Sequence, residues 1–487
     1  MMKKNTVQQL KLFNTLSREV EVFKPIEEGK IRFYTCGPTV YGTAHLGNLR
    51  TYISEDFIRR AMEAAGFQVK HVMNITDVGH LQSDEDEGED KMAVAARKEK
   101  KTPWEVARAY EDEFYEDCAK LHILKPTISC RATDHIKHMI AFVEKIKENG
   151  YTYEVNNNVY FSVDQFPDYG KMARLDLEAE GCSRVEVDAH KRNPRDFVLW
   201  FSQSKFTNQI MKWDSPWGEG FPGWHVECST MASHYLGDRV DIHMGGIDHI
   251  QIHHTNEIAQ SEAHFKKKWV NYWSHCEFLV NKEKKKIAKS EMADMSKASK
   301  PLLLSVLVEK GYDPLHYRMF CAGANYRSPL TFSWESINAA REAFETLKNL
   351  VISWKHKAGK KKALFTPAME ACRDRFWEAA FNDFNVPKCL GTMWVMARDS
   401  SLQPAEKLAL IRDFDRLFGF EVDDFHRPQL ADEMLEIIKQ REAARAGKDW
   451  AASDRIRDEL LAKGIQLMDT PQGTDWYCIQ KLEADLS

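Results

Sequence analysis

The segment from Thr35 to Asn48, T-C-G-P-T-V-Y-G-T-A-H-L-G-N, constrains the fold of this chain more than any other. The residues that lead into it, from Arg32, form a strand-like run, which a glycine–proline pair breaks. From about Gly47 the apolar positions follow the spacing of an amphipathic helix. A strand that runs into a helix N-terminus offers free N–H groups and a favourable dipole to an anion. The pattern therefore predicts a phosphate site near His45 and Asn48, although the same corner taken alone is more often structural.

Length and composition limit the class of protein. The chain has 487 residues, 43% of them hydrophobic, which is enough for several packed domains. No apolar run approaches the roughly 20 residues that span a bilayer, and the polar, lysine-bearing start does not resemble a secretory signal. The ten cysteines are scattered, without the spacing of a disulfide framework. We therefore expect a cytoplasmic protein with reduced thiols and no membrane segment.

The hydrophobic patterns change several times along the chain. Strand-like and helix-like runs alternate to about residue 80, as in an α/β fold with a parallel sheet. The same character returns near residue 200, which predicts one sheet domain interrupted by an insertion. Within the insertion, an acidic stretch at 83–90 reads as a loop, and helical patterns over 102–150 precede a β-rich region. From about residue 335 the pattern is almost entirely helical.

A second group of candidate residues lies far downstream. Cys228 occurs in G-W-H-V-E-C-S-T-M, and His253 and Glu257 lie four residues apart in H-H-T-N-E-I-A-Q-S-E. On a helix these two residues share a face, which is a geometry that a metal can bridge. With Cys36 they offer two thiolates, one imidazole and one carboxylate, a set that suits tetrahedral zinc. From spacing alone, buried thiols and an ordinary helix histidine are an equally good interpretation.

Eight segments occur in an order that a known family shares. They are T-C-G-P-T-V-Y (35–41), N-I-T-D-V (74–78), K-R-N-P-R-D-F-V-L-W (191–200), S-P-W-G-E-G-F-P-G-W-H-V-E-C-S (215–229), G-G-I-D (245–248), H-H-T-N-E-I-A-Q-S-E (253–262), Y-R-S-P-L-T-F (326–332) and D-T-P-Q-G-T (469–474). In these segments the chain resembles the cysteinyl-tRNA synthetases, a family of class I aminoacyl-tRNA synthetases. So many ordered matches exclude chance, and they favour the metal interpretation over the structural one.

The resemblance implies an α/β fold, with a Rossmann-like parallel-sheet catalytic domain, an inserted domain, a helical bundle and a small C-terminal domain. It implies the following limits: the two halves of the catalytic domain at 1–80 and 201–275, the inserted acceptor-end domain at 81–200, a lysine-motif loop and stem-contact region at 276–334, a tRNA-binding bundle at 335–427 and an anticodon-binding domain at 428–487.

The activity implied by the resemblance has two steps. The carboxylate of L-cysteine attacks the α-phosphorus of ATP, which is bound with Mg²⁺, so that cysteinyl adenylate forms and pyrophosphate leaves. The terminal ribose of tRNA(Cys) then takes the cysteinyl group and AMP leaves. Both nucleophiles come from substrates, so the enzyme positions them and stabilises charge on the phosphates. In this family one zinc per chain binds the substrate thiolate, which serine cannot match, so no editing site is required. A monomer is the family's usual form.

The resemblance also implies roles for particular residues. The family's zinc ligands fall on Cys36, Cys228, His253 and Glu257. Contacts to the amino acid fall on Gly37, Thr76 and Trp224; for Trp224 an ordinary core aromatic is the alternative, and we favour the role in the pocket. ATP contacts fall on His45, Gly47, Asn48, Gly245, Gly246, Asp248 and Lys289. The catalytic groups are His45, Asn48, Lys286 and Lys289.

Two motifs depart from the family pattern. Asn48 stands where the last histidine of the first motif often occurs; asparagine still donates a hydrogen bond but carries no charge, so we expect a modest retuning. The sequence K-I-A-K-S at 286–290 fits a variant of the K-M-S-K-S motif, and D-M-S-K-A at 294–298 is a second candidate. We prefer 286–290, because the second candidate replaces the first lysine with an aspartate, which would repel phosphate.

Several alternatives stay open at this point. The arginines within 441–460 either contact RNA or lie on a solvated amphipathic helix, and the lysine-rich stretch at 355–362 is either a tRNA contact or a turn. One rival function is a ligase that joins cysteine to an amino sugar without tRNA. Another is a tRNA-binding paralogue without catalysis. The C-terminal region argues against the first rival, and the zinc ligands with His45 and Lys289 argue against the second.

Overall fold

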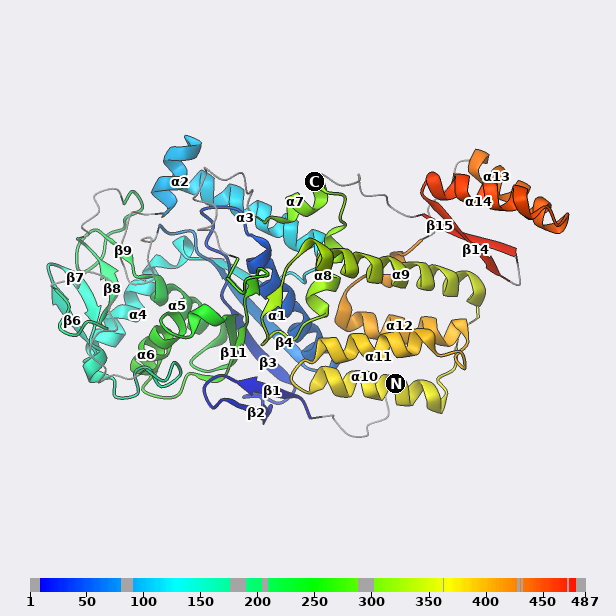
Figure 1. Ribbon diagram of the computed structural model, residues 1–487. Helices are drawn as coiled ribbons and strands as arrows, with labels where there is room; N and C mark the ends of the chain where they lie inside the picture. The colour runs from blue at the N-terminus through cyan, green and yellow to red at the C-terminus, as the bar shows by residue number, and fades with distance from the viewer. Residues whose placement is uncertain are drawn as a thin grey trace.

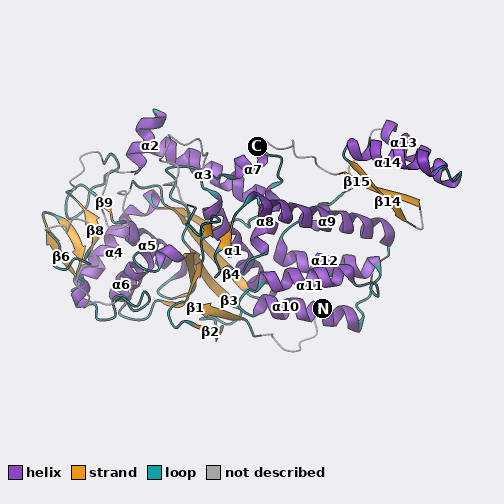
Figure 2. Ribbon diagram, viewed as in Figure 1, coloured by secondary structure: helices purple, strands orange, loops and turns teal. Residues whose placement is uncertain are grey.

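The computed structural model centres on a five-stranded parallel sheet that lies between a small antiparallel sheet and a helical bundle (Figures 1 and 2). It describes residues 9–79, 91–175, 190–203, 209–287, 302–361, 363–426, 430, 432–470 and 473–478. The predicted acidic loop at 83–90, Lys289 and the second lysine-motif candidate at 294–298 lie outside the described residues.

The parallel sheet has the strand order β11-β10-β3-β4-β5. Its strands are β3 (Lys30–Thr35), β4 (Gln68–Ile75), β5 (Ile128–Arg131), β10 (Val240–Gly246) and β11 (Val270–Cys276). All neighbours are parallel, and Thr35 pairs with Met73 on β4 and with Met244 on β10. The strand order reverses between β3 and β10, and ligands of such sheets bind at the carboxyl ends beside this reversal. The prediction of a Rossmann-like α/β fold is confirmed.

Helices cover both faces of this sheet. On one face, α1 (Leu46–Ala64) buries Leu49, Ile53 and Phe57 against a core that includes Phe33 of β3. On the other face the core contains Tyr34 and residues of α4 (Ile136–Glu148), α5 (Trp224–Leu236) and α6 (His253–Phe265). Successive residues of β3 thus point into different cores, and β3 is buried on both faces as parallel strands usually are.

The antiparallel sheet joins four short strands. They are β6 (Thr152–Val155), β7 (Asn158–Phe161), β8 (Phe197–Phe201) and β9 (Phe221–Pro222), in that order. The edge strand β5 of the parallel sheet also falls within 81–200, so part of the segment predicted as an insertion contributes to the main sheet. Its sequence, I-S-C-R, is short and mixed in polarity. It therefore left no strand signal between the two helical patterns that flank it.

The remaining elements are mostly helical. Outside the bundle and the C-terminal part, they are α2 (Lys91–Glu99), α3 (Pro103–Lys120), α7 (Leu304–Glu309), α8 (Pro314–Ala322), η1 (Thr133–His135), η2 (Val163–Gln165), η3 (Ile247–His249) and the strand pairs β1 (Lys11–Asn14) with β2 (Glu19–Val22) and β12 (Leu279–Val280) with β13 (Leu330–Thr331). The bundle comprises α9 (Trp334–Ala358), α10 (Pro367–Phe381), α11 (Val386–Arg398), α12 (Pro404–Phe418) and η5 (Val422–Asp424). Beyond it lie α13 (Asp432–Ala446), α14 (Trp450–Ala462) and the hairpin β14 (Ile465–Thr470) and β15 (Gly473–Cys478), apart from the sheet (Figure 1).

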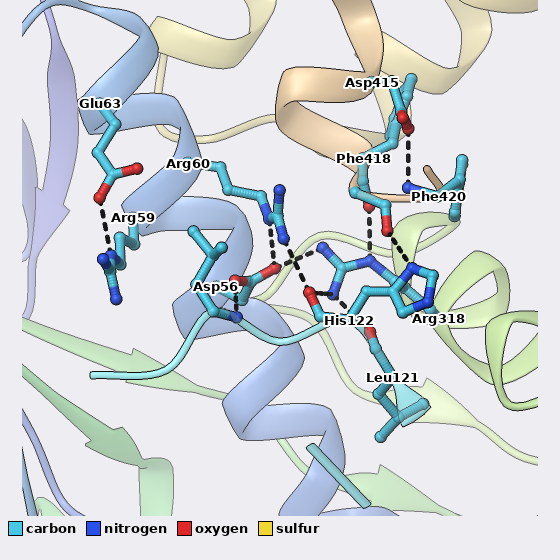
Figure 3. A network of polar contacts seen from close by, with 12 residues as sticks. Asp56, Arg59, Arg60, Glu63, Leu121, His122, Arg318, Asp415, Phe418 and Phe420 are labelled. Carbon is cyan, nitrogen blue, oxygen red and sulfur yellow. Dashed lines mark hydrogen bonds and ion pairs between the residues drawn. The ribbon is translucent and has the colours of Figure 1, made fainter. Parts of the chain in front are cut away.

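A buried polar network joins the bundle to α1, the helix on one face of the parallel sheet (Figure 3). Arg318 on α8 is fully buried and forms an ion pair with Asp56 on α1. Its guanidinium also donates to the carbonyls of Phe418, at 2.5 Å, and Leu121, at 2.9 Å. Phe418 is the last residue of the bundle helix α12, and Leu121 follows α3. One side chain therefore holds three separate helices at fixed positions around α1.

Asp56 is the anion of this network. Arg60 donates to Asp56 Oδ2 at 2.7 Å, and the Leu124 N–H donates to Oδ1 at 2.8 Å. Burial acts to raise the pKa of Asp56, but the charges of Arg318 and Arg60 hold it below its usual value. The carboxylate is therefore charged and fully paired, as a buried ion must be to persist.

Asp77, which follows β4, ties that strand to the end of β5. It accepts hydrogen bonds from the N–H of Thr133, at 2.9 Å, and from its hydroxyl, at 2.5 Å. Burial raises the pKa of Asp77 to about 6, although these hydrogen bonds oppose the shift. Because an unfolded aspartate titrates near about 3.9, the stabilising contribution is complete below that pH and is lost as the pH rises through about 6.

We expect Asp77→Asn to raise the melting temperature more near about pH 8 than near about pH 5. The amide retains an acceptor for the Thr133 N–H and gains a donor for its hydroxyl, while it removes the charge that burial disfavours. Differential scanning calorimetry of both proteins at the two pH values measures the difference. An equal change in melting temperature at both would contradict the assignment.

Candidate functional site

A cavity of about 490 Å³ opens at the carboxyl ends of β3 and β10, where the strand order reverses. Its lining includes these predicted site residues: Cys36, Gly37, His45, Gly47, Asn48, Thr76, Trp224, Cys228, Gly246, Asp248, His253 and Lys286. Gly245 precedes Gly246 on β10, and Glu257 is fully buried behind the wall. Among the described residues, the structure thus brings together candidates that come from segments far apart in the sequence.

His45 and Asn48 form the N-terminal cap of α1. The Asn48 N–H donates to His45 Nδ1 at 3.2 Å, and the His45 N–H donates to Asn48 Oδ1 at 3.3 Å. Because Nδ1 accepts a hydrogen bond, the neutral imidazole carries its proton on Nε2. Asn48 therefore orients the histidine and closes the cap, a task that needs no charge. The positive end of the helix dipole lies at the cavity.

The residue after Cys36 is held by β4 at very close range. A Cβ atom on Gly37 would lie 1.6 Å from the carbonyl oxygen of Asn74, so only glycine fits here. The Gly37 N–H also donates to Asn74 Oδ1 at 2.9 Å, and Asn74 Nδ2 donates to the Thr76 hydroxyl at 3.0 Å. Thr76 in turn donates to Glu227 at 3.1 Å. Asn74 was not predicted as a site residue, although it begins the N-I-T-D-V segment.

Four donor groups converge beside Gly37. Ligand atoms of Cys36, Cys228, His253 and Glu257 all lie within 4.8 Å of one another, and all four residues are buried. Cys36 follows β3, Cys228 lies in the first turns of α5, and His253 and Glu257 lie one turn apart on α6. Glu257 Oε1 lies 3.1 Å from His253 Nε2 but makes no hydrogen bond. A buried carboxylate oxygen without a donor, beside two thiols and an imidazole, fits a bound cation.

The charged groups of this cluster shift one another's pKa values toward the charged forms. Burial acts to raise the pKa of Glu257, but the charges of His243 and His253 lower it to about 2. Burial acts to lower the pKa of His253, but Glu257 and a hydrogen bond with Cys228 raise it to about 10. Burial would likewise raise the pKa of Cys228, yet hydrogen bonds with Cys36 and His253 lower it. One thiol of the pair is thus favoured as the thiolate, the form in which cysteine binds metals.

A ring of buried histidines surrounds the donors. His243 Nε2 lies 2.9 Å from Glu257 Oε2, and His225 Nδ1 lies 2.8 Å from His253 Nδ1. His243 and His254 also form a second group of possible ligands with Cys36 and Glu257. Of the residues that differ between the two sets, Cys228 and His253 line the cavity and His243 and His254 do not, so the set with Cys228 and His253 is the better candidate. The sequence analysis missed His243, which shares a strand face with Gly245 two residues later.

Asp248 and Lys286 also line the cavity, and their side chains meet there. Lys286 Nζ lies 2.7 Å from Asp248 Oδ2 and 4.3 Å from the centre of the Phe278 ring. Burial acts to raise the pKa of Asp248, but the charges of His249 and Lys286 hold it below its usual value. A carboxylate and an ammonium group therefore stand next to the helix N-terminus, as a nucleotide site requires.

Comparison with known proteins agrees with this arrangement. Residues 22–342 match the family described as the tRNA synthetases class I (C) catalytic domain, and residues 427–476 match the cysteinyl-tRNA ligase anticodon binding domain. The chain is 42% identical to the cysteine–tRNA ligase of Treponema denticola, over 96% of this chain and 99% of that protein. The chain belongs to the cysteinyl-tRNA synthetase family. The resemblance predicted from the sequence is confirmed, and with it the assignment as a ligase.

Other relatives of this synthetase give the same result. It is 44% identical to cysteine–tRNA ligase 1 of Burkholderia lata, over 95% of this chain and 96% of that protein. The methionyl-tRNA synthetase of Mycobacterium tuberculosis, solved with methionyl-adenylate, has a TM-score of 0.58 at 14% identity, covering 81% of this chain and 93% of that one. That likeness shows the fold. Among the described residues, no helix is both long and apolar enough to cross a membrane.

Proposed function

We propose that this synthetase activates L-cysteine with ATP to give cysteinyl adenylate and pyrophosphate, and then transfers the cysteinyl group to the 3′ end of tRNA(Cys). The observation that carries the proposal is the single cavity in which a thiol-rich donor set faces a helix N-terminus. One end suits a thiol-bearing amino acid and the other suits phosphates. The identity of 42% over 96% of the chain to a cysteine–tRNA ligase supports the same activity.

The ATP end is assigned as follows. His45 Nε2–H and the N-terminal N–H groups of α1 donate to phosphate oxygens, and Asp248 accepts hydrogen bonds from the ribose. Gly47, Asn48, Gly245 and Gly246 complete this end. Lys286 and Lys289 supply positive charge to the phosphates, and Mg²⁺ accompanies ATP. No side chain of the protein acts as a nucleophile, because both nucleophiles belong to substrates.

The amino-acid end is assigned to the donor set. Cys36, Cys228, His253 and Glu257 would hold one zinc ion per chain, which the buried Glu257 oxygen without a hydrogen bond supports. Bound there, zinc supplies a ligand position that a thiolate fills far better than the hydroxyl of serine. The Trp224 ring lies 4.7 Å from the His253 ring and lines the cavity. Trp224, Gly37 and Thr76 therefore enclose the substrate cysteine.

The C-terminal part is assigned to tRNA. The anticodon binding domain match at 427–476 supports anticodon recognition by residues 428–487, and the bundle and the acceptor-end segment complete the tRNA surface at the limits predicted from sequence. Arg441 is 1% exposed and donates to Asp469 at 2.7 Å, so it holds the hairpin against α13. The match to an anticodon binding domain argues against the alternative function, a ligase that joins cysteine to an amino sugar without tRNA. We further propose a monomer that works in the cytoplasm.

Cysteine-dependent ATP–pyrophosphate exchange tests the first step, and charging of tRNA(Cys) tests the second. We expect exchange with cysteine, none with serine, and loss of exchange after zinc removal that zinc restores. Exchange without charging would favour the amino-sugar ligase. A folded, zinc-loaded protein without exchange would overturn the proposal in favour of the inactive paralogue.

Lys286→Ala tests the ATP end separately. Loss of one charged contact of about 1.5–3 kcal/mol predicts a rise of about tenfold or more in the KM for ATP. The KM for cysteine should change by less than about twofold, because the side-chain contacts described for Lys286 are with Asp248 and Phe278 and not with the donor set. Pyrophosphate-exchange kinetics with each substrate varied in turn measure both constants. Equal changes in the two would contradict the assignment.

A further inference from the structure

We propose that Arg50, a buried arginine on α1, is a positioning residue that sets the Lys286 turn against the helix capped by His45. The Lys286 turn is defined here as residues 279–287. The inference rests on the proposed function, because it concerns how the two ATP-binding motifs are held in register. Arg50 lies one turn beyond His45 on the same helix and is 2% exposed.

The contacts of Arg50 are unusual for a buried cation. Nη1 donates to the carbonyl of Glu277, at 2.7 Å, and to that of Phe278. Nη2 donates to the carbonyls of Asn325, at 3.4 Å, and Ser328. Within the described part of the chain, no carboxylate forms an ion pair with it. The planar guanidinium therefore bridges two backbone segments through charge-assisted hydrogen bonds.

These two segments carry the Lys286 turn. The Phe278 carbonyl also accepts from the Leu330 N–H at 3.0 Å, so Arg50 reinforces the junction of β12 with β13. The turn starts at the next residue and closes where Ile287 donates back to Leu279 at 3.0 Å. Glu277 and Phe278 line the cavity, and the Phe278 ring carries the Lys286 ammonium group. The segment that Arg50 binds, Glu277 and Phe278, therefore also positions the Lys286 side chain.

The same turn packs directly on the start of α1. A Cβ atom on Gly47 would lie 3.2 Å from the Ile287 carbonyl oxygen and 2.8 Å from the His45 ring. The His45 cap and the Lys286 turn are therefore adjacent, and Arg50 connects them through the backbone of Glu277 and Phe278 without itself lining the cavity. Because reacting groups misplaced by about 1 Å can cost about a hundredfold in rate, a residue that fixes this spacing affects ATP use without touching ATP.

Arg50→Lys tests the inference with the charge kept. A lysine ammonium group lacks the planar fork and cannot bridge four carbonyls, so the Lys286 turn loses its fixed position. We expect the KM for ATP in pyrophosphate exchange to rise about tenfold, in parallel with Lys286→Ala, while the KM for cysteine changes by less than about twofold. Zinc content should stay at the wild-type value, because the donor set lies on other elements.

Arg318→Lys is the matched control. Arg318 is equally buried and also donates to backbone carbonyls, but it lies in the joint with the bundle and not beside the cavity. We expect it to lower the melting temperature and leave both KM values within about twofold of wild type. If both variants act through a general loss of packing, the KM for ATP should change equally in Arg50→Lys and Arg318→Lys. That result would overturn the inference.

Two further outcomes would overturn it. One is a folded Arg50→Lys enzyme with the wild-type KM for ATP; the other is an equal rise in the KM values for ATP and cysteine.

If Arg50→Lys does not fold, Asn325→Ala replaces it as the test. The Asn325 side chain accepts from the Arg327 N–H at 2.9 Å and shapes the turn that presents the Asn325 and Ser328 carbonyls to Arg50. We expect a smaller rise confined to the KM for ATP; no rise would overturn the inference. A wild-type enzyme without exchange would overturn the proposed function, and this inference with it.

Discussion

Replacing Cys228 with serine is expected to abolish most cysteine-dependent ATP–pyrophosphate exchange and to release the metal. The change removes one of the two thiol donors, so the metal is left with Cys36, His253 and Glu257 as ligands. Removing only a supporting residue of a metal site typically costs about 10–100-fold, so loss of a ligand should cost at least about a hundredfold. Exchange kinetics and zinc analysis of the purified protein measure the two effects.

The control for this prediction is Cys389→Ser. Cys389 is a fully buried thiol on α11 whose only described hydrogen bond is to the Phe376 carbonyl at 3.4 Å. The same chemical change there should leave zinc content and exchange at wild-type values, with at most a loss of stability. A Cys228→Ser protein that keeps its zinc and its exchange rate would show that the donor set with His243 and His254, not the proposed one, holds the metal.

The corner from strand to helix was the easiest part of the molecule to predict. Its strand contains the apolar residues Ile31, Phe33 and Tyr34 and ends before a glycine–proline pair, and its helix is amphipathic, so β3 and α1 follow from local patterns. The donor set was harder, because its four residues come from three segments and only the resemblance placed them together. The His253–Glu257 spacing, by contrast, predicted a shared helix face, and α6 has that face turned inward.

What the sequence could not show depends on long-range contacts. The four-residue strand β5 has no periodicity of its own and exists because β4 offers it a partner. Arg50 reads as a surface arginine of an amphipathic helix, yet backbone carbonyls from residues 277–328 surround it. Polar residues in such roles are recognisable only once the segments that satisfy them are in place, since any single segment offers no partner.

The second large effect is expected at the joint with the bundle, where Arg318→Met should destabilise the protein by about 3–5 kcal/mol, the usual cost of breaking a buried ion pair. The methionine is of similar length but leaves Asp56, which is 3% exposed, with Arg60 as the only cation paired with it among the described residues. It also leaves the Phe418 and Leu121 carbonyls without a donor (Figure 3). Calorimetric unfolding, with exchange activity as a check of the folded fraction, measures the loss.

The control Arg412→Met removes an arginine of α12, the bundle helix that ends at Phe418, whose ion pair with Asp423 is exposed. Such a pair contributes at most about 1 kcal/mol, so its loss should be small. Adding Asp56→Asn to Arg318→Met should recover part of the stability, because the penalty comes mainly from an uncompensated buried charge. If the double variant is as unstable as the sum of its single changes, the joint is held by packing around α8, and the ion pair is incidental to it.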